Sequence, residues 1–110
     1  MKSVGRTAGL TWVYVTAPDR VVARRIARAL VAERLAACVN VLGAVESTYR
    51  WKGAVEQGRE VALIAKTQQR RLAALTARVA ELHPYEVPCV VALPIRGGNR
   101  AFLSWVRAET

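Results

Sequence analysis

Histidine and cysteine are nearly absent from this sequence. Its 110 residues contain one histidine, His83, and two cysteines, Cys38 and Cys89. The two cysteines lie too far apart to form the CxxC pattern of a redox or structural zinc motif. We therefore expect two ordinary, half-buried thiols that remain reduced in the cell.

The sequence also lacks long apolar runs and has few acidic residues. No stretch approaches the roughly 18 apolar residues of a membrane helix, and the opening MKSVGRTAG has no apolar core of a secretory signal. We therefore expect a cytoplasmic protein with no membrane contact. Eight acidic residues stand against 17 basic ones, for a formal net charge of +9. This charge favours contact with any phosphate backbone but identifies no partner.

What the chain does have is a high apolar content, 53%, in a length that suits one core. We expect a single domain over residues 1–110 with a flexible tail over residues 1–9. The residue patterns predict the following elements: a strand over Leu10–Thr16, a helix over Arg20–Arg34 capped by Asp19, a strand over Cys38–Trp51 bulged at Gly43, a strand over Glu60–Thr67, a helix from Leu72 to Leu82, a strand over Cys89–Ile95 and a short helix capped by Asn99.

This order, with right-handed crossovers, predicts an α+β, ferredoxin-like βαββαβ sandwich with an antiparallel sheet of strand order 4-1-3-2. The hairpin between the second and third strands is unusually long, and we expect Glu56–Gly58 to loosen its near end. Cys38 and Cys89 fall on the two edge strands, too far apart for a disulfide within one subunit. The third and fourth strands are apolar at both parities, which favours burial of the second sheet face against another copy of the chain.

Six motifs, TAPD, ERLAACVNV, STYRWKG, ALIAKT, HPYEVP and ALPI, follow one another over about residues 13 to 106. Together they resemble the CutA divalent-cation tolerance family. The resemblance implies a homotrimer built like the PII signalling proteins, a link to tolerance of copper and other divalent metals, and no catalytic activity. It also implies that the long hairpin reaches a neighbouring subunit, with Tyr49 and Trp51 near the interface.

The same resemblance places His83 at a metal-ligand position. Val15 and Leu82 occupy the positions of the family's cysteine and first histidine ligands, so only one of three copper ligands remains. We expect weak binding of copper(II) or another divalent metal at His83, with Cys89 and Glu86 as further donors. The alternative is that His83 only ends a helix: Pro84 stops the helix there and leaves the imidazole beside the last helical carbonyl groups.

Other functions remain as alternatives of different kinds. A PII-like sensor would bind a small ligand in a cleft between subunits, to which Tyr49, Trp51, Lys66 and Tyr85 would contribute. A nucleic-acid-binding domain of this topology stacks bases on aromatic residues of its third strand, and EVALIAKT has none, which leaves only binding that ignores sequence. A cysteine enzyme would need a group to orient the histidine base, and none is evident beside Cys89 and His83.

Overall fold

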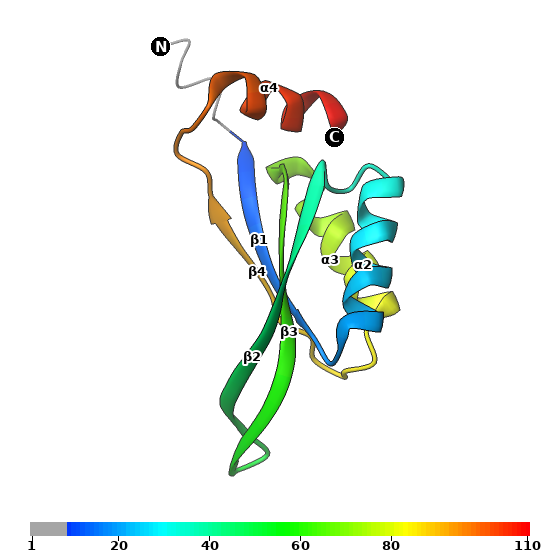
Figure 1. Cartoon of the computed structure of the whole chain (residues 1–110), viewed down its shortest axis with the longest axis vertical. Helices are drawn as coiled ribbons and strands as arrows, with labels where there is room; N and C mark the ends of the chain where they lie inside the picture. The colour runs from blue at the N-terminus through cyan, green and yellow to red at the C-terminus, as the bar shows by residue number, and fades with distance from the viewer. Residues whose placement is uncertain (1–8) are drawn as a thin grey trace.

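A computed structural model describes residues 9–110 as a four-stranded sheet with helices (Figure 1). The predicted tail over residues 1–9 lies, apart from Gly9, outside the described residues. The elements follow in chain order: β1 (Leu10–Ala17), α2 (Arg20–Ala32), β2 (Cys38–Trp51), β3 (Ala54–Gln68), the short 3₁₀ helix η1 (Gln69–Arg71), α3 (Leu72–Leu82), β4 (Val90–Pro94) and α4 (Arg100–Glu109). The strand order β2-β3-β1-β4, antiparallel throughout, confirms the predicted α+β topology.

Local sequence signals set several of these boundaries. The Asp19 carboxylate accepts a hydrogen bond from the backbone N–H of Val22 at 2.9 Å, and the Asn99 side chain accepts one from Phe102 at 3.0 Å. Both residues therefore cap the helices that follow them, as predicted. The β2–β3 register shifts between Val41 and Gly43, where Gly43 adopts φ +125°, so the predicted bulge is confirmed as well.

The hairpin formed by β2 and β3 is longer than predicted. Its ladder runs without a break from the bulge to Trp51, which pairs with Ala54. The expectation that Glu56–Gly58 would loosen the hairpin is therefore wrong. The reason lies in the turn, because Lys52 and Gly53 both have positive φ, 50° and 84°. Two such residues suit the tight turn whose twist matches that of paired strands.

The two faces of the sheet differ in what covers them. α2 and α3 lie along one face (Figure 1), where Val13 and Val15 pack with Ile26 and Leu75 in a fully buried core. Alternate residues of β1 point to the other face, where the described residues supply no covering helix. There Val91 of β4 lies beside β1 and is 53% exposed. This uncovered face is where we expect another subunit.

One end of the sheet is closed by α4 (Figure 1). Leu103 and Val106 of this helix pack against Leu10 and Ala37 in a second, smaller buried cluster. α4 is also the last element of the described chain. No helix among residues 9–110 is long and apolar enough to cross a membrane.

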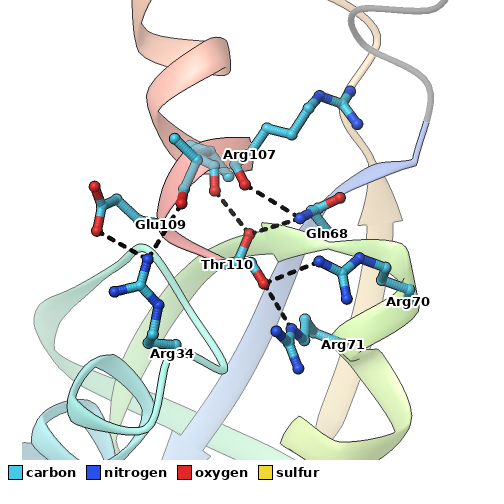
Figure 2. A network of polar contacts seen from close by, with 9 residues as sticks. Arg34, Gln68, Arg70, Arg71, Arg107, Glu109 and Thr110 are labelled. Atoms are coloured by element: carbon cyan, nitrogen blue, oxygen red, sulfur yellow. Dashed lines mark hydrogen bonds and ion pairs between the residues drawn. The ribbon is translucent and has the colours of Figure 1, made fainter.

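Polar contacts tie the end of the chain to the sheet at the same place (Figure 2). The side chain of Arg71 donates to the backbone oxygen of Thr110 at 2.7 Å, and Arg70 donates to the same oxygen at 3.3 Å. Gln68 donates to the Arg107 carbonyl at 3.2 Å, and the Thr110 hydroxyl donates to the carbonyl of Val106 at 2.7 Å. The last residue of β3 and two residues of η1 thus hold the last turn of α4.

Candidate functional site: an aromatic cavity at the base of the hairpin

A cavity of about 630 Å³ opens beside the hairpin. Three segments form its walls: the end of β1, the paired strands β2 and β3, and the connector, by which we mean residues 83–89 between α3 and β4. Tyr14 and Thr16 alternate along β1 with Val13 and Val15, which face the helices. The cavity therefore lies on the uncovered face of the sheet.

Four aromatic side chains line this cavity, namely Tyr14, Tyr49, Trp51 and Tyr85. Tyr49 and Trp51 come from β2, and Tyr85 comes from the connector. Three of the four residues that the sequence predicts for a cleft are thus brought together in one subunit. Each is more than a third exposed, which leaves room for contact with a ligand or a second subunit. That the cavity lies at a subunit boundary stays a prediction.

The fourth predicted cleft residue, Lys66, is not part of the cavity lining. It pairs with Trp12 of β1 and with Cys38 of β2, nearer the end that α4 closes. Its ammonium group donates to the side-chain oxygen of Asn40 at 2.5 Å. The structure therefore places Lys66 away from Tyr49, Trp51 and Tyr85, because five residues of β3 separate it from Glu60 and the register between β1 and β3 continues without a shift.

Glu60 is the carboxylate of this cavity that the sequence analysis missed, together with the lining residues Tyr14, Thr16, Ser47, Arg50 and Val87. The Ser47 hydroxyl donates to its Oε1 at 2.5 Å. Ser47 pairs with Gly58, so Glu60 is its diagonal neighbour across the ladder, within reach of a side-chain contact. Counting paired residues back from a turn at Lys52–Gly53 would have predicted that Glu60 lies diagonally opposite Ser47. The sequence analysis expected a loosened hairpin, and strands that are not paired have no register from which to predict this neighbour.

Tyr85 is the second partner of Glu60. Burial raises the pKa of the Tyr85 phenol above its ordinary value of 10.0, and the Glu60 carboxylate raises it further through its charge and a hydrogen bond. A neutral phenol can donate a hydrogen bond to the Glu60 carboxylate, whereas a phenolate would repel that carboxylate. The connector and β3 are therefore joined at the cavity wall by a neutral donor and an anionic acceptor.

His83 lies behind Tyr85 and takes no part in lining the cavity. As predicted, α3 ends at Leu82, and His83 adopts extended backbone geometry. The predicted position of the imidazole beside the last helical carbonyl groups is wrong, however. The ring is 7% exposed and turns towards β1, where Nε2 lies 2.7 Å from the carbonyl oxygen of Thr16. Nδ1 accepts the backbone N–H of Tyr85 at 3.2 Å.

These two bonds fix the chemistry of His83. A carbonyl oxygen accepts and a backbone N–H donates, so Nε2 carries the proton and Nδ1 offers its lone pair to Tyr85. Both ring nitrogens are thus engaged in hydrogen bonds, so a metal ion could bind either one only by displacing its present partner. The neighbour of His83 along the connector, Tyr85, is held in place by the second of these bonds.

The other predicted metal donors do not join His83. Glu86 and Cys89 both line the cavity, which His83 does not, while Val15 is buried in the core. Among residues 9–110, no three histidine, cysteine, aspartate or glutamate side chains gather in a group that could hold a metal ion. The donors of one subunit therefore do not fit a metal site. Both cysteines are free.

Comparison with known proteins gives consistent matches. The sequence profile of the CutA1 divalent ion tolerance protein family matches residues 11–109. The divalent-cation tolerance protein CutA of Thermus thermophilus is 51% identical over 98 residues, which cover 89% of this chain and 95% of that protein. The human protein CutA is 50% identical over 97 residues, 88% of this chain, which spans about half of the human protein (54%).

Solved structures agree with this match. The Thermus thermophilus divalent cation tolerance protein superposes with a TM-score of 0.90 at 50% identity, covering 92% of this chain and 98% of that one. CutA1 from Oryza sativa gives a TM-score of 0.91 at 44% identity over 96% of each chain. Both likenesses extend over nearly the whole chain.

Proposed function

Because the chain belongs to the CutA1 divalent ion tolerance family, we propose that it acts in divalent-cation tolerance as a non-enzymatic homotrimer. The family profile covers every element from β1 to α4. A cytoplasmic location is part of the same proposal. The proposal has two parts that can be tested separately, the assembly and the affinity for metal.

The uncovered sheet face supports the assembly. Val91 and Leu93 of β4 are 53% and 49% exposed, and Tyr49 and Trp51 extend the apolar surface onto the hairpin. An apolar surface of this extent on a soluble chain indicates a protein partner, and a closed ring of identical subunits buries it without leaving a free edge. Light scattering should give three times the chain mass of 12.1 kDa. A monomer mass at micromolar concentration would contradict the trimer.

The state of His83 supports weak affinity for metal. Copper(II) could bind its Nδ1 only by displacing the N–H of Tyr85, which costs a buried hydrogen bond. We expect calorimetry to detect weak copper(II) binding that free histidine removes in competition. His83→Gln, whose amide N–H can still donate to the Thr16 carbonyl, should abolish it. Tight binding of copper(II), or binding that is unchanged in His83→Gln, would overturn this part of the proposal.

A second candidate function, a sensor of small ligands, is favoured by one observation. The cavity brings Tyr49, Trp51 and Tyr85 together with the carboxylate of Glu60, which accepts a hydrogen bond from Ser47. Its volume of about 630 Å³ lies within the usual range of small-molecule sites, and such sites combine apolar walls with a few placed polar groups. Binding of any small molecule that is lost in Trp51→Ala would support this function.

Binding of nucleic acid without regard to sequence is a weaker alternative, resting on the arginines of α2. Arg20, Arg24 and Arg28 recur along one side of that helix, and no ion pair is found for them among the described residues. A gel shift with a salt series would test it, because phosphate contacts weaken steeply as salt rises. We expect no shift at physiological salt.

A further inference from the structure

In the described part of the chain, the carboxylate of Glu60 is held by hydrogen bonds and not by an ion pair. Its two partners, the hydroxyl groups of Ser47 and Tyr85, are neutral donors. Among residues 9–110, no lysine, arginine or histidine forms an ion pair with it. A hydroxyl group positions a carboxylate and stabilises its charge but leaves the net charge in place. The cavity therefore contains an oriented anion, with lone pairs left over.

The walls around this anion suit a positive charge as well. The faces of tyrosine and tryptophan rings carry negative charge density and attract cations within about 6 Å. Tyr14, Tyr49, Trp51 and Tyr85 supply four such rings from three different segments. A second carboxylate, that of Glu86, also lines the cavity. Aromatic faces beside a held carboxylate form the kind of site that recognises an organic ammonium group.

A metal ion is a poor match for the same cavity. The two carboxylates and the Cys89 thiol that line the cavity do not gather into a group that could hold a metal ion. The cavity is also far larger than one ion, so that a ligand must bring an apolar body to fill it. An ammonium group on an apolar body meets both demands, because its N–H groups can donate to the free lone pairs of Glu60.

We propose that this cavity binds a protonated primary amine with an apolar or aromatic body, whose ammonium group pairs with Glu60 and whose body packs against Tyr49, Trp51 and Tyr85. The proposal rests on the small-ligand cavity described above and names its ligand class. Arg50 also lines the cavity, and its charge opposes a cation. Replacing it with a neutral side chain should therefore strengthen amine binding, which is a direction that a purely apolar pocket would not show.

Three probes of nearly the same size separate charge from shape. They are 2-phenylethylamine, 2-phenylethanol and 3-phenylpropanoate, which place a cation, a neutral hydroxyl and an anion on the same aromatic body. Calorimetry on the whole protein near neutral pH measures each affinity. We expect the amine to bind at least about tenfold more tightly than the alcohol, since a hydrogen bond to a charged group is the stronger one. The anion should not bind.

Two matched variants locate the charge. Glu60→Gln keeps the size of the side chain and removes its charge, and it should weaken amine binding about tenfold while leaving the alcohol unchanged. Glu56→Gln is the control, because Glu56 lies on the same strand, opposite Tyr49, but does not line the cavity. It should leave both affinities unchanged. Light scattering and melting of each variant confirm that assembly and fold are retained.

The outcomes distinguish failure of the amine class from failure of the proposed small-ligand function. Equal binding of the amine and the alcohol, or tighter binding of the anion, overturns the amine class. If Trp51→Ala removes that binding, the cavity is still a ligand site. Amine affinity that survives Glu60→Gln likewise overturns the role of Glu60. Binding of none of the three probes at millimolar concentration overturns the amine class, whereas the small-ligand function, the trimer and the metal affinity stand on their own measurements.

Discussion

The two ends of this molecule satisfy their polar groups in different ways. At the end closed by α4, Gln68, Arg70 and Arg71 donate to oxygen atoms of the last helical turn, and Thr110 is only 5% exposed (Figure 2). At the hairpin end, Glu60 is held only by neutral hydroxyl groups, and large aromatic side chains are exposed around it. The closed end satisfies its polar groups within one chain, whereas we expect the hairpin end to be completed by a partner or a ligand.

This difference divides stability from recognition. Buried apolar side chains and paired polar groups raise the free energy of unfolding of the subunit, and both are concentrated around the helices and α4. Exposed aromatic groups and an unpaired charge contribute little until something binds them. Substitutions at the closed end should therefore change folding, and substitutions at the hairpin end should change assembly or ligand affinity.

The largest effect on stability is expected for Leu103→Ala. Leu103 is 6% exposed and packs with Val106 and Leu10 beneath α4. Removing its side chain should lower the free energy of unfolding by about 3 kcal/mol, from lost burial and the cavity left behind. Denaturant unfolding should show the same loss at every subunit concentration. Phe102→Ala, on the exposed side of the same helix, is the matched control and should cost far less.

Trp51→Ala tests the other half of the comparison. Trp51 is 39% exposed at the end of the hairpin, so that its loss should change only the concentration-dependent part of the stability, through assembly. The division between the two ends would be wrong if Trp51→Ala reduced subunit stability as much as Leu103→Ala does.

His83→Ala should have the next largest effect on stability, because this buried residue joins the two regions. The change leaves the Thr16 carbonyl and the Tyr85 N–H without partners, and we expect a loss of about 2 kcal/mol in the free energy of unfolding. Ligand affinity at the cavity should fall as well, since Tyr85 loses the bond that positions it. A variant with unchanged melting would show that neither bond matters to the fold.

Arg71→Ala should have a smaller effect. Its Nε donates to the Thr110 backbone oxygen at 2.7 Å, while Arg70 still reaches that oxygen at 3.3 Å. The loss should be about 1 kcal/mol, typical of one hydrogen bond whose partner keeps another donor. Hydrogen exchange should locate it, with faster exchange in α4 and none of that change in the hairpin. Faster exchange throughout the chain would instead indicate a role beyond the closed end.

Much of the fold could be predicted because its signals are local. Asp19, Asn99 and Gly43 act on residues within a few positions of themselves, so that the sequence alone identifies the caps and the bulge. The strand order follows from general rules about connections between such elements. The family resemblance, carried by motifs along most of the chain, agrees with the matched profile.

The site could be predicted only in part, because its contacts depend on register and on distant segments. Tyr49, Trp51 and Tyr85 stand out by residue type, and the structure brings them together. The position of Glu60 depends on the register of the β2–β3 ladder, which the sequence analysis expected to be loosened at Glu56–Gly58. The bond of His83 reaches a carbonyl group 67 residues earlier, at Thr16, which no local pattern reveals.

The smallest effect is expected for Lys66→Ala, and it tests the boundary between the two regions. The sequence predicts Lys66 in the cleft, whereas the structure pairs it with Trp12 and lets its ammonium group donate to Asn40 in an exposed contact. Exposed polar contacts of this kind contribute little, and we expect a change below about 0.5 kcal/mol in the free energy of unfolding. Amine affinity should not change either, because Lys66 does not line the cavity. If removing this positive charge changed amine affinity as much as replacing Arg50 does, the field of the cavity would extend along β3 beyond its lining, and the hairpin end could no longer be treated as separate from the rest of the sheet.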